Sequence, residues 1–370
     1  MKKWIRRIHL WLGLASGLLV FIIAVTGALY AFQDEIQDLT QPYRRVVAQQ
    51  RPVLLPSAIQ KIAATTLPGK SLHSINYFND NRSIELVYYH YEPTYYYKAY
   101  LNPYTGELLH VQNMTEGFFN FILEGHMYLW LPREIGTVVV LSATLIFSVM
   151  VISGLVLWWP RSRKLSGQRF LFRWKATTSA KRKTWDLHSI LGFYSCAVAL
   201  VFIITGLVWV LPVFADGWYR LVGGKKSIVY AEPLSSSLPS GKGNMLDELF
   251  ILKKEERLRS SAWELHPPGT DSSSILVMAN PDKGVYWRSD YTFYDQYSLQ
   301  ELPVQHLWGK YKAATGADKI LRLNYDIHVG AVLGLPGKTM AFLFSLMIAS
   351  LPVTGFLIWW GRRNKMRSIT

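Results

Sequence analysis

Four long runs of apolar residues dominate the hydrophobic pattern of the chain. They cover Leu10 to Ala31, Gly136 to Trp159, Ser189 to Val210 and Met340 to Trp360, with almost no ionisable side chains. Each run is long enough to cross a hydrocarbon core of about 30 Å as a helix. The pattern therefore predicts an integral membrane protein with four transmembrane α-helices.

Two long segments between these runs mix helical spacing with strand-like alternation. The first predicts a helix over Pro56–Thr66 and strands over Ser71–Phe78, Ser83–Tyr91, Tyr95–Leu101 and Glu107–Val111. The second predicts a helix over Met245–Arg259 and strands over Ala262–His266, Ser274–Ala279 and Val285–Phe293. Segments of roughly 100 and 120 residues are each large enough for a small domain with its own core. We therefore expect two α+β domains.

The expected division of the chain follows from these two patterns. Transmembrane helices are expected over residues 1–32, 134–160, 186–211 and 336–361. Extramembrane domains are expected over residues 33–133 and 212–335, with a basic loop over 161–185 and a tail over 362–370.

The second half of the chain repeats the first. His9 lies 17 residues before Thr26, and His188 lies 17 residues before Thr205, an offset of 179. A gapless match over such a span indicates an internal repeat. The sequence thus predicts two repeated halves, an organisation that commonly builds a site between them.

The net charge of +15 is concentrated beside the apolar runs. Seventeen of the 40 Lys and Arg residues lie before His9, between Arg161 and Lys183, and between Arg362 and Arg367. The positive-inside rule places these segments and both termini in the cytoplasm, and the two large domains on the outer side of the membrane. The basic residues lack a folded basic domain around them. They therefore indicate contact with anionic membrane lipids and no nucleic-acid partner.

Four histidines near the ends of the apolar runs are candidate ligands. On the predicted topology His9 and His188 share the cytoplasmic side, and His126 and His328 share the outer side. Two neutral imidazoles from different helices can ligate a haem iron within a bundle. The carboxylate or thiolate companions expected for zinc or copper are absent near all four. Because Cys196 is the only cysteine, covalent attachment is excluded and two haem b groups are expected.

Each apolar run also contains a Val/Ile-Ser/Thr-Gly tripeptide. The glycines are Gly27, Gly154, Gly206 and Gly355. At a rise of about 1.5 Å per residue, the first and third are level with the outer histidines and the other two with the inner histidines. The glycines are therefore candidates for facing the haems. Close helix packing through small residues is the alternative.

The segment Tyr100 to Leu108, with Asn-Pro-Tyr-Thr-Gly at its centre, resembles the closing motif of PepSY domains. The whole chain resembles the PepSY-associated transmembrane family, including the similar helix ends Gly154–Trp159 and Gly355–Trp360. The second domain departs from the motif because Tyr294–Leu299 lacks Thr-Gly. The resemblance implies two periplasmic PepSY-like domains and a di-haem inner-membrane reductase. Its expected activity is to release siderophore-bound iron by reducing ferric to ferrous ion.

The electron donor and two alternative functions remain open at this point. No G-x-G-x-x-G segment follows a predicted strand, so the donor is expected to be separate, such as quinol or a cytoplasmic reductase. One alternative is a haem-free PepSY membrane protein acting as scaffold, sensor or peptidase regulator. The other keeps both haems and passes electrons to a different periplasmic acceptor.

Overall fold

The computed structural model describes residues 2–79, 81–160, 167–236 and 244–367. It divides into two compact units. The helical unit comprises residues 1–33, 121–215 and 327–370, and the sheet unit comprises residues 34–120 and 216–326. The start of the predicted basic loop, residues 161–166, and the last tail residues, 368–370, lie outside the described residues.

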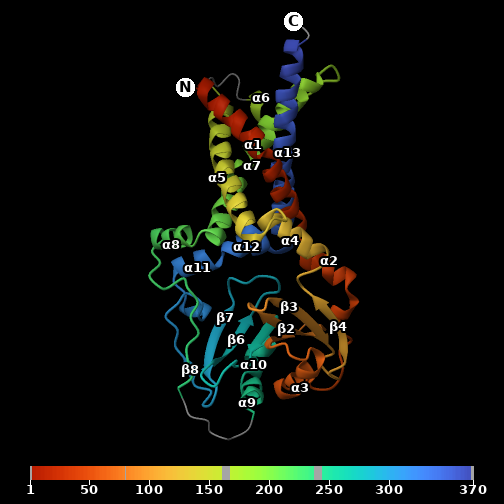
Figure 1. The fold of residues 1–370 in the computed structure, drawn as a ribbon, viewed down its shortest axis with the longest axis vertical. Helices are drawn as coiled ribbons and strands as arrows, with labels where there is room; N and C mark the ends of the chain where they lie inside the picture. The colour runs from red at the N-terminus through yellow and green to blue at the C-terminus, as the bar shows by residue number, and fades with distance from the viewer. Residues whose placement is uncertain (1, 80, 161–166, 237–243, 368–370) are drawn as a thin grey trace. The chain divides into compact units, whose positions relative to one another are not determined.

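Four long helices form the helical unit (Figure 1). They are α1 (Lys2–Tyr30), α5 (Arg133–Trp158), α7 (Ala180–Val210) and α13 (Gly334–Arg367). Helices α1 and α7 each pack against both α5 and α13. The helices therefore form a ring in which α1 and α7 are diagonally opposite, as are α5 and α13.

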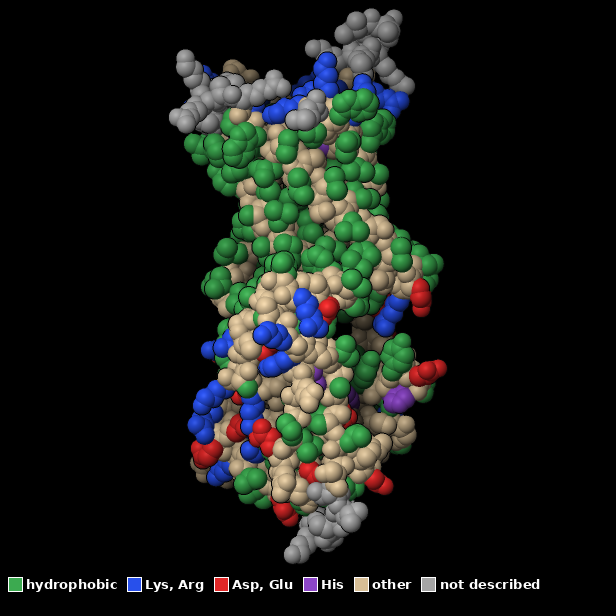
Figure 2. Space-filling view, turned by 90° about the vertical axis from the view of Figure 1, so that its left-hand side faces the viewer, with side chains coloured by type: hydrophobic (Ala, Val, Ile, Leu, Met, Phe, Trp, Pro, Cys, Tyr) green, Lys and Arg blue, Asp and Glu red, His purple; other side chains and the backbone are tan. Residues whose placement is uncertain are grey.

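The outer surface of this bundle is apolar, as a lipid environment requires. Leu145, Val149 and Ile152 of α5 are exposed, and Figure 2 shows hydrophobic side chains over the helices. Lys and Arg side chains gather at the end where α1 begins. All four helices are long and apolar enough to cross a membrane. This agrees with the predicted four-helix membrane protein.

Shorter helices complete both units. They are α2 (Gln33–Thr40), α4 (Phe118–Tyr128), α6 (Gly167–Phe170), α8 (Pro212–Leu221), α11 (Gly316–Arg322) and α12 (Asn324–His328), with 3₁₀ turns at Pro42–Arg44, Tyr311–Ala313 and Ala331–Leu333. The apolar pattern did not predict α4 and α12, which precede α5 and α13 in the chain.

The sheet unit is built on a single antiparallel sheet of eight strands in the order β4-β3-β2-β1-β5-β6-β7-β8. The strands are β1 (Leu72–Phe78), β2 (Ile84–His90), β3 (Tyr95–Leu101), β4 (Leu108–Asn113), β5 (Ala262–His266), β6 (Ser274–Asn280), β7 (Asp290–Asp295) and β8 (Glu301–Leu302). The two polar segments meet where β1 pairs with β5, with Ile75 opposite Leu265. The expectation of two domains with separate cores therefore needs correction, because pairing of β1 with β5 removes an exposed edge from each four-stranded half.

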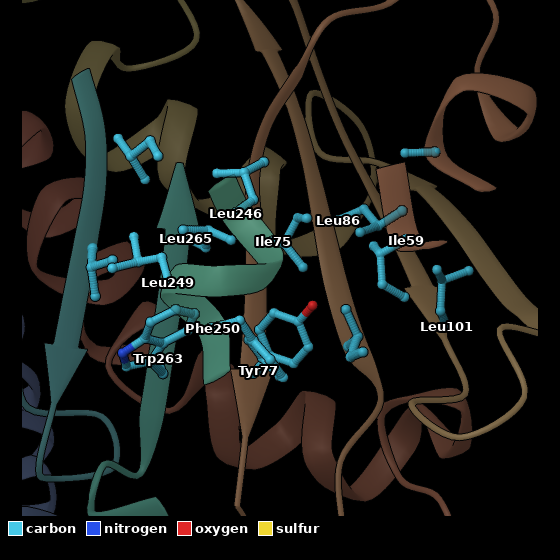
Figure 3. Close-up of a cluster of buried hydrophobic side chains, with 14 of the residues drawn as sticks. Ile59, Ile75, Tyr77, Leu86, Leu101, Leu246, Leu249, Phe250, Trp263 and Leu265 are labelled. Carbon is cyan, nitrogen blue, oxygen red and sulfur yellow. The ribbon is translucent and has the colours of Figure 1, made fainter. Parts of the chain in front are cut away.

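Helices supply the apolar layer on one face of this sheet. Ile59 of α3 (Pro56–Thr66) and Leu249 of α9 (Met245–Leu252) are fully buried against Ile75, Leu86 and Trp263 of the strands (Figure 3). Helix α10 (Lys254–Arg259) follows α9 directly. The two polar segments therefore share one hydrophobic core.

The turns after β3 and β7 have the same backbone hydrogen bonds despite their different sequences. The carbonyl of Asn102 accepts the N–H of Gly106, and the carbonyl of Asp295 accepts the N–H of Leu299, both at 2.9 Å. In each turn the side-chain oxygen of the first residue accepts the N–H two residues later, at 3.0 Å. Gly106 and Leu299 have φ values of +75° and +57°. The second turn thus keeps the geometry of the first without its Thr-Gly.

Candidate functional site

The four candidate histidines form two close pairs in the helical unit. The ring centroids of His9 on α1 and His188 on α7 are 6.4 Å apart, with ring planes at 83°. Those of His126 on α4 and His328 on α12 are 6.1 Å apart, with planes at 63°. Because α1 and α7 are diagonal in the ring of helices, the first pair meets across the bundle. The structure thus brings together the pairs expected from the sequence.

Hydroxyl groups on neighbouring helices contact Nδ1 of two of these histidines. Nδ1 of His9 lies 2.9 Å from Oγ of Ser153, and Nδ1 of His328 lies 2.7 Å from Oγ1 of Thr205. Both hydroxyls donate their own protons to carbonyl groups in the preceding turn of their helix. Each hydroxyl therefore accepts the Nδ1–H of its histidine.

Backbone carbonyl groups contact Nδ1 of the other two histidines. Nδ1 of His126 lies 2.9 Å from the carbonyl oxygen of Ile23. Nδ1 of His188 lies 3.1 Å from the carbonyl oxygen of Leu351 and 3.0 Å from Oγ1 of Thr354. A carbonyl oxygen only accepts, so Nδ1 carries the proton here as well. All four imidazoles therefore keep the Nε2 lone pair for a ligand, as metal-binding histidines do.

The four candidate glycines lie beside these imidazoles. A Cβ atom would lie 3.2 Å from Cε1 of His9 at Gly154, 3.2 Å from Cε1 of His188 at Gly355, 2.8 Å from Cε1 of His126 at Gly27, and 3.7 Å from Cε1 of His328 at Gly206. Their heights are those expected from the sequence. The absence of a side chain at each glycine makes room for the neighbouring histidine ring. The sequence analysis had instead expected the glycines to make room for the haem itself.

Within each half of the chain, the histidine associated with one long helix packs on the glycine of the other long helix. His9 of α1 packs on Ser153 and Gly154 of α5, while Gly27 of α1 faces His126 of α4, the short helix that precedes α5. Helices α7 and α13 repeat this arrangement through His188 and His328. The dipeptides that begin at Ser153, Thr205 and Thr354 therefore supply both a hydroxyl contact and a gap, whereas Thr26-Gly27 supplies the gap alone. Sequence reasoning used only the glycine and missed the hydroxyl, although its fixed place before the glycine was a visible signal.

The spacing of each pair suits a metal ion held between two imidazoles. Two metal–imidazole bonds of roughly 2 Å each, with the two half-rings, span roughly 6 Å. Both centroid separations, 6.4 Å and 6.1 Å, are close to this span. Within the described ranges, no group of three or more His, Cys, Asp or Glu residues could hold a metal ion. Two protein ligands per site fit a haem, since the porphyrin supplies the others.

The sheet face opposite the apolar core carries buried ionisable groups that the sequence analysis did not identify. Nζ of Lys98 lies 2.9 Å from Oε2 of Glu85. Burial alone would raise the pKa of Glu85, but Lys98, with Arg44 and Arg82, lowers it below its usual value. Burial likewise opposes ionisation of Asp38, whose pKa is lowered by Arg82 and Arg44.

A small imidazole cluster lies on the same face. The ring centroids of His73 and His266 are 4.8 Å apart, and Nε2 of His266 lies 3.2 Å from Oε1 of Glu264. Burial lowers the pKa of His73, and the neighbouring His266 lowers it further. His73, His90, His110, His266 and His306, to which the sequence analysis gave no ligand role, all belong to the sheet unit.

A ring of four membrane-crossing helices with two imidazole pairs, joined to an antiparallel sheet unit, defines a class of integral membrane protein. The model of the PepSY-associated TM region matches residues 6–362 of the chain. The chain therefore belongs to this family, and the resemblance seen in the sequence is confirmed. No curated protein matches the chain in sequence.

Proposed function

We propose that this protein binds two haem b groups in the inner membrane and transfers electrons to ferric siderophores in the periplasm. One observation carries the proposal. Nδ1 of each imidazole lies within 3.1 Å of a carbonyl or hydroxyl oxygen on a neighbouring helix, an arrangement that leaves Nε2 for a ligand, and the rings form two pairs with centroids 6.4 Å and 6.1 Å apart.

The residues of the chain would position the cofactors and keep water away from them. Haem at these sites would supply one-electron redox chemistry. Ser153 and Thr205 fix the ring orientations of His9 and His328, respectively. The middle of the bundle is packed with Val20, Ala199 and Ile348 and with partly buried phenylalanines. This apolar layer separates the two imidazole pairs along the helices.

The charge distribution supports an orientation for the chain. Basic residues lie where α1 and α7 begin and where α13 ends. The positive-inside rule then assigns this end, with the His9–His188 pair, to the cytoplasmic side. The His126–His328 pair and the sheet unit belong to the periplasmic side in this assignment.

Reduction of the metal accounts for iron release. One electron converts a bound ferric ion to a ferrous ion, which the hard oxygen ligands of a siderophore hold less tightly. The donor is proposed to be separate from the chain, as a quinol or a cytoplasmic reductase. A quinol would give up two electrons and two protons and so reduce two ferric complexes. The sheet unit would bind the ferric siderophore.

Histidine substitutions test the ligand assignment. His9→Ala or His188→Ala should lower the haem content from two to one per chain by removing one haem, and His126→Ala or His328→Ala should remove the other. His90→Ala is the matched control, because His90 is exposed at the end of β2 and its variant should keep both haems. Loss of both haems from every folded variant would contradict the assignment.

Mixing chemically reduced protein with ferric siderophores under anaerobic conditions tests the acceptor. Stopped-flow absorbance should show oxidation of the haems. A ferrous chelator should report one ferrous ion released for each haem oxidised. Haem-loaded protein that no ferric siderophore oxidises would contradict the substrate assignment. Oxidation by cupric ion or a periplasmic redox protein alone would favour a different acceptor.

A further inference from the structure

The His126–His328 pair is built differently from the His9–His188 pair. His9 and His188 lie within long membrane-crossing helices, α1 and α7. His126 and His328 lie on the short helices α4 and α12, each followed by a turn into the next long helix. A short helix has little stability of its own. Contacts with the long helices must therefore fix these two imidazoles.

In the first half, a glycine in the opening turn of α5 makes such a contact. A Cβ atom at Gly136 would lie 2.5 Å from the carbonyl oxygen and 2.7 Å from Cα of Tyr128. Tyr128 is two residues beyond His126. The backbone just after the histidine therefore rests on α5 at a distance that only glycine allows.

The second half has the same contact at the corresponding place. Gly337 lies in the opening turn of α13, and a Cβ atom there would collide with the carbonyl oxygen of Gly330. Gly330 is two residues beyond His328. A Cβ atom at Gly330 would in turn collide with the carbonyl group of Gly337.

The rest of the two turns differs between the halves. In the first, Leu129 and Trp130 adopt positive φ values of +55° and +57°, and Nε1 of Trp130 donates to the carbonyl of Phe121 at 2.8 Å. In the second, Gly330 and Gly334 adopt the positive φ values, +78° and +63°. The contact of the His-bearing segment with a helix glycine is therefore common to both halves, whereas the way in which the turn closes is not.

We infer that Gly136 and Gly337 are positioning residues that set the depth and direction of His126 and His328. The inference rests on the proposed haem function and extends it to residues outside the ligand set. A methyl group at either position would push the backbone beyond the histidine away from its helix. Ligand geometry tolerates displacements of only about 0.5 Å. The displaced imidazole would then no longer complete its pair.

Alanine substitution at each glycine tests this role. Gly136→Ala and Gly337→Ala should lower haem content from two towards one per chain, or convert one low-spin haem to a high-spin form in electron paramagnetic resonance spectra. The haem at His9 and His188 should keep its signal and its midpoint potential, and so report that the bundle is folded. Added imidazole should restore the low-spin signal, since it replaces a displaced ligand.

Gly192→Ala is the matched control within a long helix. A Cβ atom at Gly192 of α7 would meet only Leu351, at an ordinary contact distance of 3.7 Å. This variant should keep both haems with unchanged spectra. If both alanine variants at Gly136 and Gly337 also keep two haems with unchanged spectra and potentials, the inference is wrong.

A second variant covers the case in which neither alanine variant folds. Tyr128→Gly removes the Cβ atom that an alanine at 136 would approach within 2.7 Å, so it loosens the contact without overpacking it. It should change the spectrum of one haem only, and unchanged spectra would overturn the inference. A colourless wild-type protein would instead overturn the proposed function together with this inference. Two haems with unchanged spectra in every variant would overturn the positioning role alone.

Discussion

The proton on each paired imidazole is fixed at Nδ1 by a group on a neighbouring helix. His126 and His188 donate to backbone carbonyl groups, and His9 and His328 donate to hydroxyl groups. A hydrogen bond from Nδ1–H makes the opposite nitrogen a stronger electron donor. In the proposed haem sites, Ser153 and Thr205 would therefore strengthen the ligand as well as lying beside the glycine that makes room for it.

Thr205→Val tests this tuning because His328 depends on the Thr205 hydroxyl for its Nδ1 acceptor. The variant should weaken one haem site by about 10- to 100-fold in affinity. It should also raise the midpoint potential of that haem, since a weaker ligand stabilises the ferric form less. Redox titration and haem release measure both effects.

Thr354→Val is the matched comparison. The carbonyl oxygen of Leu351, 3.1 Å from Nδ1 of His188, is a backbone acceptor that this change does not remove, so the effect on the other haem should be smaller. Equal effects of the two substitutions would show that the hydroxyl groups do not act through Nδ1.

The buried Lys98–Glu85 pair predicts a pH-dependent stability. Lys98, with Arg44 and Arg82, lowers the pKa of Glu85 from 4.5 against the effect of burial. A carboxyl group whose pKa is lower in the folded than in the unfolded protein stabilises the fold at any pH above its unfolded-state pKa. This contribution is lost as the pH falls through its folded-state pKa. Lys98→Met leaves Glu85 buried without its partner and should lower the free energy of unfolding by about 3 kcal/mol at pH 7.

Denaturant unfolding at neutral and acidic pH measures this effect. The difference between wild type and Lys98→Met should narrow once the pH is below 4.5, because Glu85 is then protonated in the variant. Lys61→Met, at an exposed position on α3, should change the stability little at either pH. A difference that is independent of pH would contradict the ion-pair explanation.

Among the secondary-structure elements, those with regular periodicity agree best with the sequence prediction. Helix α3 and strands β3 and β5 have the expected bounds. The strand expected from Val285 begins only at Asp290. The reason is that the backbone N–H groups of Tyr286 and Trp287 donate to the carboxylate of Asp326 instead of to a neighbouring strand. A side chain 40 residues away in sequence leaves no periodic signal at the segment that it binds.

Contacts between elements that are distant in the sequence could likewise not be predicted from the hydrophobic pattern. Periodicity indicated which residues face a core, but it did not indicate that β1 and β5 pair to join the two segments into one sheet. The candidate histidines and glycines could be found because the second half of the chain repeats their spacing, with Thr26 and Thr205 each following a histidine by 17 residues. Gly136 and Gly337 were missed, since their role depends on backbone contacts with Tyr128 and Gly330 that only the fold brings about.

The turn between β3 and β4 offers a test at this scale. Gly106 has a φ of +75°, and a Cβ atom there would lie 2.5 Å from Cδ1 of Ile62. Gly69 has a similar φ of +77° with open space around it. Gly69→Ala should cost only backbone strain, about 1 kcal/mol. Gly106→Ala should cost more, because it also overpacks the core, and thermal unfolding should rank the two variants in this order.

At the scale of the whole molecule, each imidazole pair takes one histidine from each half of the chain. Within a half, the histidine of the first long helix packs on the second, and the histidine of the short helix before the second packs on the first. Between halves the histidines meet as pairs. A single half therefore holds two unpaired imidazoles. The repeat expected from the sequence would thus supply one imidazole pair near each end of the bundle, as the proposed function requires.

The reduced-minus-oxidised absorption spectrum of the detergent-purified protein, with extracted haem quantified per chain, tests the central claim most directly. Two b-type haems per chain are predicted, because the helical unit contains two imidazole pairs with ring centroids 6.4 Å and 6.1 Å apart. A colourless protein after expression with adequate haem supply would contradict the claim and favour a haem-free scaffold, sensor or peptidase regulator.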